Sequence, residues 1–110
     1  MSKYILAMIL LLIVPNTYAN IANTILLSRT TDQKTQILSN IINAAGEPCI
    51  ATNSFFQGVD IYDSAYWNIS CSNGQSYVIQ IENNEEATTT IFQCNSMRSL
   101  GAECFKKFGS

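Results

Sequence analysis

Residues 65–81 decide the fold, and their sequence is AYWNISCSNGQSYVIQI. Apolar and polar residues alternate on both sides of Asn73-Gly74, a dipeptide that favours a turn between β-strands. We therefore expect antiparallel strands at 65–71 and 77–81, each with one apolar face. A two-residue loop would pair Trp67 with Gln80, whereas a three-residue loop at 72–74, with Gly74 left-handed, pairs apolar residues throughout. That second register places Ile69 beside Tyr77, Trp67 beside Ile79 and Ala65 beside Ile81.

One further strand is expected on each side of this hairpin. The run 50–57 is separated from Ala65 by a loop around Gly58-Val59-Asp60. The run 87–94 follows a polar turn, and its core face is ambiguous because Ile91 and Phe92 are adjacent. Consecutive strands joined by short turns favour a four-stranded antiparallel meander.

A helix is expected before the strands. Apolar residues recur with helical spacing along 33–45, and the polar residues between them face water. Thr31-Asp32 is the expected N-cap and Gly46 the expected C-cap, while Pro48 prevents continuation. A short helical turn near 96–100 follows the last strand.

The predicted fold class is α+β, with one N-terminal helix packed on a four-stranded antiparallel meander. Residues 20–30 show no clear period and are interpreted as a lead-in segment, and residues 31–110 form a single small domain. One helix covers one face of the sheet, so we expect the other face to be open. That open face would hold Tyr66, Asn68, Ser70, Val78, Gln80 and Phe56.

Residues 1–19 have the three parts of a secretory signal peptide. Lys3 gives a positive start, residues 4–14 are an uninterrupted apolar run, and Thr17-Tyr18-Ala19 has small residues where cleavage requires them. A retained anchor is the alternative, but Pro15-Asn16 interrupts the run before the roughly 20 apolar residues that a membrane span needs. Cleavage after Ala19 predicts a periplasmic or secreted protein with no stable membrane span.

The cysteines at 49, 71, 94 and 104 all follow the predicted signal peptide. An even number in a short exported chain indicates disulfides. Pairing of the first two strands about residue 60 would set Cys49 opposite Cys71, within bonding range. In a meander Cys94 lies two strands from Cys71, which at ~4.8 Å per strand is too far for a bond. We therefore predict the disulfides Cys49–Cys71 and Cys94–Cys104.

Composition argues against several function classes. Residues 20–110 hold five Lys or Arg and eight Asp or Glu, a net charge of −3. They lack the basic footprint of a nucleic-acid binder, so no nucleic-acid partner is expected. The chain has no His and no closely spaced Cys pair, which disfavours zinc binding and His-dependent catalysis. We predict no cofactor, no metal and no enzymatic activity.

Four segments form a recognisable pattern: FFQG at 55–58, AYWNISCSNG at 65–74, SYVIQI at 76–81 and LGAECF at 100–105. Together they resemble a group of short exported bacterial proteins of unassigned function. The resemblance covers residues 47–108 and implies a bacterial envelope protein, with no catalytic residues to carry over. The helix-then-meander order is also similar to PepSY-type and β-lactamase-inhibitor-like modules, which implies protein binding at the level of the fold alone.

The candidate binding residues lie on the expected open face or in the 58–64 loop. Phe56, Tyr62 and Tyr66 are candidate aromatic anchors, because tyrosine is common at interfaces. Asp60 and Asp63 are a candidate carboxylate pair. An exposed loop offers no burial to raise a carboxyl pKa for catalysis, and too few oxygens gather there for calcium.

These observations favour a non-enzymatic binding module that contacts another envelope or secreted protein through the open sheet face and the 58–64 loop. One alternative is a small ligand-carrying protein or hydrolase built on Asp60, Asp63 and the aromatic cluster. An apolar cavity beneath Trp67 would favour that alternative, and a filled core would disfavour it. Another alternative is a structural accessory subunit of an envelope complex.

Overall fold

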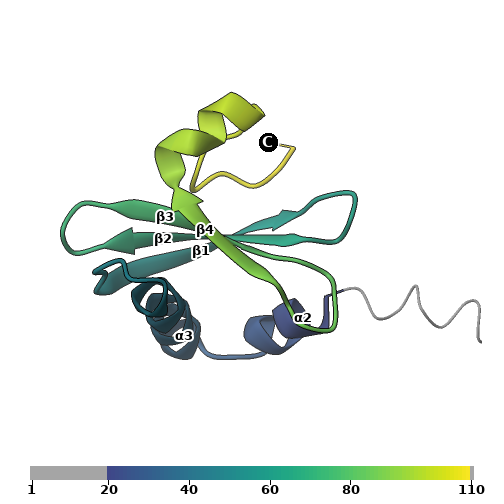
Figure 1. Ribbon diagram of the computed structural model, residues 1–110, viewed down its shortest axis with the longest axis horizontal. Coiled ribbons are helices and arrows are strands. Elements are labelled where there is room, and N and C mark those ends of the chain that lie inside the picture. The colour runs from purple at the N-terminus through teal and green to yellow at the C-terminus, as the bar shows by residue number, and fades with distance from the viewer. Residues whose placement is uncertain (1–19, 110) are drawn as a thin grey trace, which may run out of the picture.

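The computed structural model describes residues 20–109, so the predicted signal peptide lies outside the described residues. In this part of the chain two α-helices are followed by four strands and a 3-10 helix (Figure 1). Their bounds are α2 Ile21–Leu27, α3 Thr31–Ala44, β1 Ala51–Val59, β2 Ala65–Cys71, β3 Ser76–Ile81, β4 Thr89–Gln93 and η2 Cys94–Leu100. Within residues 20–109 no helix combines the length and apolar character needed to cross a membrane.

The strands form one antiparallel sheet in the order β1-β2-β3-β4, which confirms the predicted α+β fold built on a meander. The predicted β2–β3 register is also confirmed, since Trp67 lies opposite Ile79 and Ile69 lies opposite Tyr77. Gly74 lies in the connecting turn with φ 88°. Glycine adopts this left-handed backbone without a steric penalty, so the turn keeps the apolar residues of both strands on one face.

Strand β1 pairs with β2 less regularly than the sequence predicts. Ala51, and not Cys49, lies opposite Cys71, while Val59 lies opposite Ala65. The predicted centre of pairing at residue 60 is therefore wrong. The cause is a pair of register shifts, between 51 and 53 and between 56 and 58, which insert extra residues into β1.

Both disulfides join the cysteines that the strand geometry predicts. Cys49 is bonded to Cys71 with their Cα atoms 5.2 Å apart, and Cys94 is bonded to Cys104 with their Cα atoms 5.8 Å apart. Cys49 reaches Cys71 from a position just before β1. The first bond therefore ties the beginning of β1 to the end of β2, and the second ties η2 to the C-terminal tail.

Helix α3 corresponds to the predicted helix but has a different N-cap. The Thr30 hydroxyl accepts a hydrogen bond from Gln33 N, and the Gln33 side-chain oxygen accepts one from Thr30 N. This capping box satisfies two otherwise unpaired donors, so the N-cap is Thr30, one residue before the predicted cap at Thr31-Asp32, and the helix begins at Thr31. Leu38 and Ile42 form the buried apolar stripe of α3.

Residues 20–30, interpreted from sequence as a lead-in with no clear period, contain a helix that the prediction of one N-terminal helix omits, because α2 occupies Ile21–Leu27. Asn20 caps this helix, and its side-chain oxygen accepts a hydrogen bond from Asn23 N. The buried residues of α2 are Asn23 and Leu26. A polar asparagine on the buried side breaks the apolar period, and the helix is therefore invisible to an argument from hydrophobic spacing.

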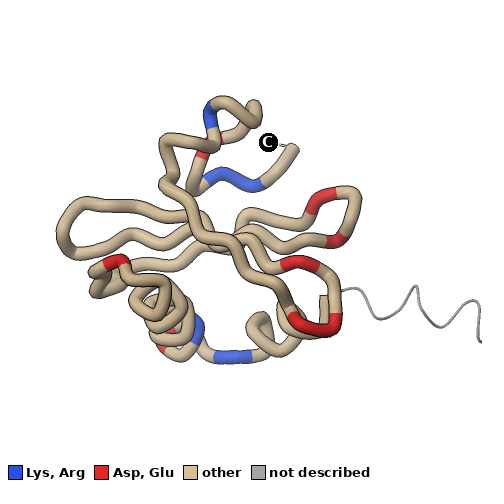
Figure 2. The backbone as a smooth tube through the Cα atoms, viewed as in Figure 1, with Lys and Arg blue, Asp and Glu red and all other residues tan. Residues whose placement is uncertain are grey.

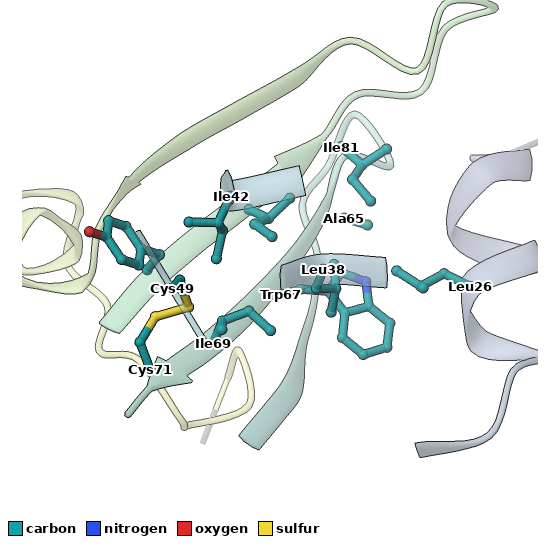
Figure 3. Packing of buried hydrophobic residues seen from close by; sticks show 11 residues of the cluster. Leu26, Leu38, Ile42, Cys49, Ala65, Trp67, Ile69, Cys71 and Ile81 are labelled. Carbon is teal, nitrogen blue, oxygen red and sulfur yellow. A yellow bond between two sulfur atoms is a disulfide. The ribbon is translucent and has the colours of Figure 1, made fainter. Parts of the chain in front are cut away.

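The hydrophobic core lies between the two α-helices and one face of the sheet (Figure 3). Trp67 and Tyr77 are buried in it, as the alternation predicts, and Ile91 of β4 packs against it. The ambiguous core face of β4 is therefore the side that carries Ile91. The buried members are Leu26, Leu38, Ile42, Cys49, Ala65, Trp67, Ile69, Cys71, Tyr77, Ile79 and Ile81.

The sequence predicts that the second face of the sheet is open, but in the structure this face is covered. Residues 94–109, which we call the C-terminal cover, comprise η2 and the tail and lie on the side of the sheet opposite α3 (Figure 1). Val78 of β3 and Met97 of η2 are both buried. The cover therefore forms a second, smaller packed layer held in place by the Cys94–Cys104 disulfide.

Polar residues of the sheet hold this cover in place. Asn68 is fully buried, and its Oδ1 accepts a 2.6 Å hydrogen bond from Phe105 N. Its Nδ2 donates to Gln57 Oε1, and Gln57 Nε2 in turn donates to the carbonyl of Glu103. A buried polar side chain is stable when its partners are present, and here the tail backbone supplies them.

Candidate functional site

The two most exposed large apolar side chains in residues 20–109 lie side by side in the chain, between β1 and β2. Ile61 is 88% exposed and Tyr62 is 75% exposed. They belong to residues 60–64, which we call the hairpin tip, and the predicted 58–64 loop is shortened because β1 continues to Val59. Exposed isoleucine and tyrosine at the end of a hairpin can be buried by a partner, so the tip is the leading candidate for a binding surface.

The carboxylate of Asp60 fixes the shape of the hairpin tip. Its Oδ1 accepts hydrogen bonds from Tyr62 N at 2.9 Å and Ser64 N at 3.1 Å, and its Oδ2 accepts one from the Tyr66 hydroxyl at 2.8 Å. Backbone bonds from Asp60 N to Ser64 O and from Asp63 N to Asp60 O close the same turn. Asp60 therefore organises the loop from within, and both of its oxygens are engaged in doing so.

Asn20 attaches the hairpin tip to the beginning of α2. Its Nδ2 donates hydrogen bonds to the carbonyl oxygens of Asp63 and Ile81, each at 2.8 Å. Asp63 has φ 60°, a left-handed conformation that aspartate tolerates better than most residues. The role of Asp63 here is thus structural, through its backbone, and Asn20 joins the tip, α2 and the end of β3.

Helix α2 presents a second group of exposed apolar side chains at the same end of the molecule. Ile21 and Ile25 are both exposed, and with Ala22 and Ala87 they line a groove of about 660 Å³. Because Asn20 joins the first turn of α2 to Asp63, this groove belongs to the same end as the hairpin tip (Figure 1). Two apolar surfaces therefore lie at one end of the fold.

Acidic residues surround this end. Five of the eight Asp and Glu residues lie in the hairpin tip or in the β3–β4 connection, as Figure 2 shows. They are Asp60, Asp63, Glu82, Glu85 and Glu86. The described Lys and Arg residues lie elsewhere, on the α2–α3 side and in the C-terminal cover. An apolar surface rimmed by carboxylates favours a partner that carries positive charge.

Tyr66 lies beside the tip but is held within the fold. Its hydroxyl donates to Asp60 and accepts from Gln80 Nε2 at 2.9 Å, and its ring meets the Phe108 ring edge-on at 5.1 Å. Burial, followed by the hydrogen bond to Asp60 and the charge of that carboxylate, raises the pKa of Tyr66 to about 12. Tyr66 therefore supports the tip, and the sheet face on which it lies is covered by the tail at Phe108 and is not open.

Phe56 lies on the opposite face of the sheet from Tyr66. Its ring packs on Trp67 with centroids 4.9 Å apart, and it borders the main core. The five predicted binding residues thus do not form one surface. Asp60, Tyr62 and Asp63 share the hairpin tip, Tyr66 supports it from the covered face, and Phe56 packs against the core from the other face.

The surroundings of Trp67 argue against a ligand cavity beneath it. Its Nε1 donates to Asn23 Oδ1, Phe56 packs on the ring, and Lys34 Nζ lies 5.7 Å from the ring centroid. Both Asp60 oxygens accept hydrogen bonds from residues of the tip and from Tyr66. In residues 20–109 no group of three or more His, Cys, Asp or Glu is placed to hold a metal ion. The Trp67 ring is thus enclosed by contacts from α2, α3 and β1.

Sequence reasoning misses the α2 part of this site. Ile21 and Ile25 lie in the segment interpreted as a lead-in, and nothing in the sequence indicates that Asn20 contacts the hairpin tip. The one available signal concerns the helix, because asparagine followed by a run of helix-compatible residues is a common N-cap.

Comparison with protein-family models, curated proteins and solved structures finds no match for this chain. The resemblance to short exported bacterial proteins, and the fold-level likeness to PepSY-type modules, therefore stay predictions.

Proposed function

We propose that this chain is an exported, non-enzymatic module that binds another envelope or secreted protein through the hairpin tip and the neighbouring face of α2. The observation that carries the proposal is the exposure of Ile61 and Tyr62 on a turn that Asp60 holds rigid. The two disulfides are in keeping with a protein that works outside the reducing cytosol.

Rigidity of the tip supports a binding role. A flexible loop would lose conformational freedom when it orders against a partner, which weakens binding by about 0.5–1.5 kcal/mol for each immobilised side chain. Asp60 and Asn20 fix the backbone of the tip before any partner arrives. Exposed apolar side chains on such a fixed turn can contribute their burial free energy to association with little ordering cost.

The acidic rim sets the character of the partner. Asp60, Asp63 and the glutamates of the β3–β4 connection would repel an acidic protein and attract a basic one. We therefore expect the partner to present apolar side chains within a positively charged surface. Binding of this kind weakens as salt is added, because ions screen exposed charges beyond about 10 Å at 0.1 M.

Site-specific crosslinking in the cells that export the protein tests the proposal. A photo-crosslinking amino acid replaces Tyr62, and in a matched control it replaces Ile50, which is 74% exposed and directly precedes β1 at the end away from the tip. We expect a crosslinked protein at position 62 that is absent at position 50. The proposal is wrong if position 62 gives no product, or if both positions capture the same proteins.

Alanine variants then measure the contribution of each side chain. Ile61→Ala and Tyr62→Ala should each weaken the crosslinked complex, while Ile50→Ala should leave it intact. All three side chains are mostly exposed, so the melting temperature should change little in any variant. A loss of complex that parallels a loss of stability would assign the effect to unfolding and count against the tip.

A further inference from the structure

A second site, independent of the hairpin tip, lies within the C-terminal cover. The tail folds back beside η2 and leaves a pocket of about 440 Å³ between them. Arg98 of η2 lines one part of it, and Lys106, Lys107 and Phe108 of the tail line another. The volume is within the range of about 300–1,000 Å³ that small-molecule sites occupy.

The pocket gathers most of the positive charge of the described chain. Three of the five Lys and Arg residues of 20–109 line it, whereas only one of the eight carboxylates, Glu103, does so. The net charge of these lining groups is +2, while the rest of residues 20–109 carries −5. In Figure 2 the blue segments of η2 and the tail lie above the sheet, apart from the acidic tip at one end of it.

The scaffold of this pocket is fixed. The Cys94–Cys104 disulfide joins η2 to the tail, and Phe108 N donates a 3.0 Å hydrogen bond to Gln57 O in the sheet. Gln57 is itself buried and holds the Glu103 carbonyl. The charged side chains therefore extend from a backbone that does not need to be ordered by a ligand.

The three basic side chains that line the pocket have different surroundings. Lys106 Nζ lies 3.1 Å from a Glu103 carboxylate oxygen, and both side chains are largely exposed to solvent. Lys107 Nζ lies 4.7 Å from the Phe56 ring centroid and 5.4 Å from that of Phe55, which holds it over the β1 edge. Arg98, in the last turn of η2, brings a guanidinium, the group that binds phosphate with two parallel hydrogen bonds.

We propose that this pocket binds a phosphate monoester. Such a group carries a charge of about −1.5 to −2 at neutral pH, which matches the excess of +2 on the lining groups. Leu100, 68% exposed, directly precedes pocket residue Gly101, and Phe108 closes the tail side. A phosphate attached to an apolar group could therefore place its apolar part on Leu100, and the phosphate could come from a soluble molecule or from a lipid headgroup.

Two probes separate the two sources of phosphate. The first is glycerol phosphate, titrated into the purified, oxidised protein while amide chemical shifts are followed. The second is a set of vesicles made from equal parts of phosphatidylcholine and phosphatidic acid, compared with phosphatidylcholine alone in sedimentation. Shifts at residues 98–109 with glycerol phosphate indicate a soluble ligand, and sedimentation with the acidic vesicles alone indicates a lipid headgroup. Either result supports the proposal if binding of the probe depends on Arg98.

Charge-matched variants establish that dependence. Arg98→Gln should weaken binding of the active probe by about tenfold or more, the loss expected for one charge-assisted hydrogen bond. Arg29→Gln removes the same charge from an exposed position between α2 and α3 and should change binding by less than about twofold. The melting temperature of both variants checks their folding. The proposal is overturned if neither probe binds, or if the two variants weaken binding equally.

Discussion

Trp67 Nε1 donates a 2.7 Å hydrogen bond to Asn23 Oδ1, and this contact joins β2 to α2 across 44 residues of sequence. Both residues are buried. A helix of seven residues is not stable on its own in water, so α2 depends on contacts of this kind with the sheet. Because α2 also carries Ile21, Ile25 and the Asn20 link to the hairpin tip, the Trp67–Asn23 bond supports the candidate binding end.

Replacement of Asn23 tests this dependence. Asn23→Leu leaves the buried Trp67 N–H without its partner, and we expect the free energy of unfolding to fall by about 1–3 kcal/mol. Urea denaturation followed through the fluorescence of Trp67, the single tryptophan, measures the change. Asn40→Leu makes the same substitution on the exposed face of α3 and should stay within about 0.5 kcal/mol of the wild type. Equal costs in the two variants would contradict the role of the bond.

The Cys94–Cys104 disulfide is expected to control the C-terminal cover more than the sheet. Replacement of both cysteines by serine removes a loop constraint worth about 3 kcal/mol on the chain-entropy model. Amide hydrogen exchange should accelerate at Phe105 and Phe108, whose N–H groups bond to Asn68 Oδ1 and Gln57 O, before it accelerates in β2 and β3.

The matched control is the double serine variant of Cys49 and Cys71. That disulfide closes a longer segment, 22 residues against 10, and ties β1 to β2 instead of holding the cover. It should destabilise the whole domain by about as much or more, with no preferential exchange at Phe105 and Phe108. If amide hydrogen exchange accelerates uniformly across the domain in both variants, the cover does not open on its own.

The β2–β3 hairpin and the helix α3 are predictable from sequence because their rules are local. Trp67, Ile79 and Tyr77 alternate with polar residues, and a one-residue slip would move every one of them to the wrong face. The disulfide pairing follows from the same meander, because sheet spacing excludes a Cys71–Cys94 bond. Here local pattern and tertiary structure agree.

The covered face and α2 are not predictable in this way, because buried polar side chains carry the contacts. Asn23, Gln57 and Asn68 count as solvent-facing in a hydrophobic pattern, yet each is buried with a hydrogen-bond partner. Their partners are distant in sequence, so no local window reveals them. The same limit hides the phosphate pocket, since Arg98 and Lys106 come together only through the fold of the tail.

Tyr66 should give the protein an alkaline stability limit. Its pKa is raised from 10.0 to about 12, so the folded state holds the phenol proton more tightly than the unfolded state. The associated stabilisation is fully present below pH 10 and is lost as the pH rises from 10 to 12. Tyr66→Phe should reduce the slope of unfolding free energy against pH in that window, measured by urea denaturation at each pH. An unchanged slope in Tyr66→Phe would contradict the assignment.

Gly58 allows the tail to pack on the sheet, and its replacement should separate backbone strain from steric contact. Its φ is 137°, and a Cβ at this position would lie 3.1 Å from Phe108 Cδ2. Gly74 also has a positive φ, 88°, but a Cβ there meets nothing within 4 Å. Both Gly→Ala variants therefore carry a conformational penalty of about 1 kcal/mol or more, and only Gly58→Ala must also displace Phe108.

The displacement has a specific signature. In Gly58→Ala, exchange of the Phe108 amide, which bonds to Gln57 O, should accelerate beyond the amount that its loss of global stability explains. In Gly74→Ala the same amide should follow global stability alone. Since Phe108 also lines the basic pocket, Gly58→Ala should weaken phosphate binding there while Gly74→Ala should not. If exchange of the Phe108 amide follows global stability alone in both variants, the contact between Gly58 and Phe108 does not hold the tail.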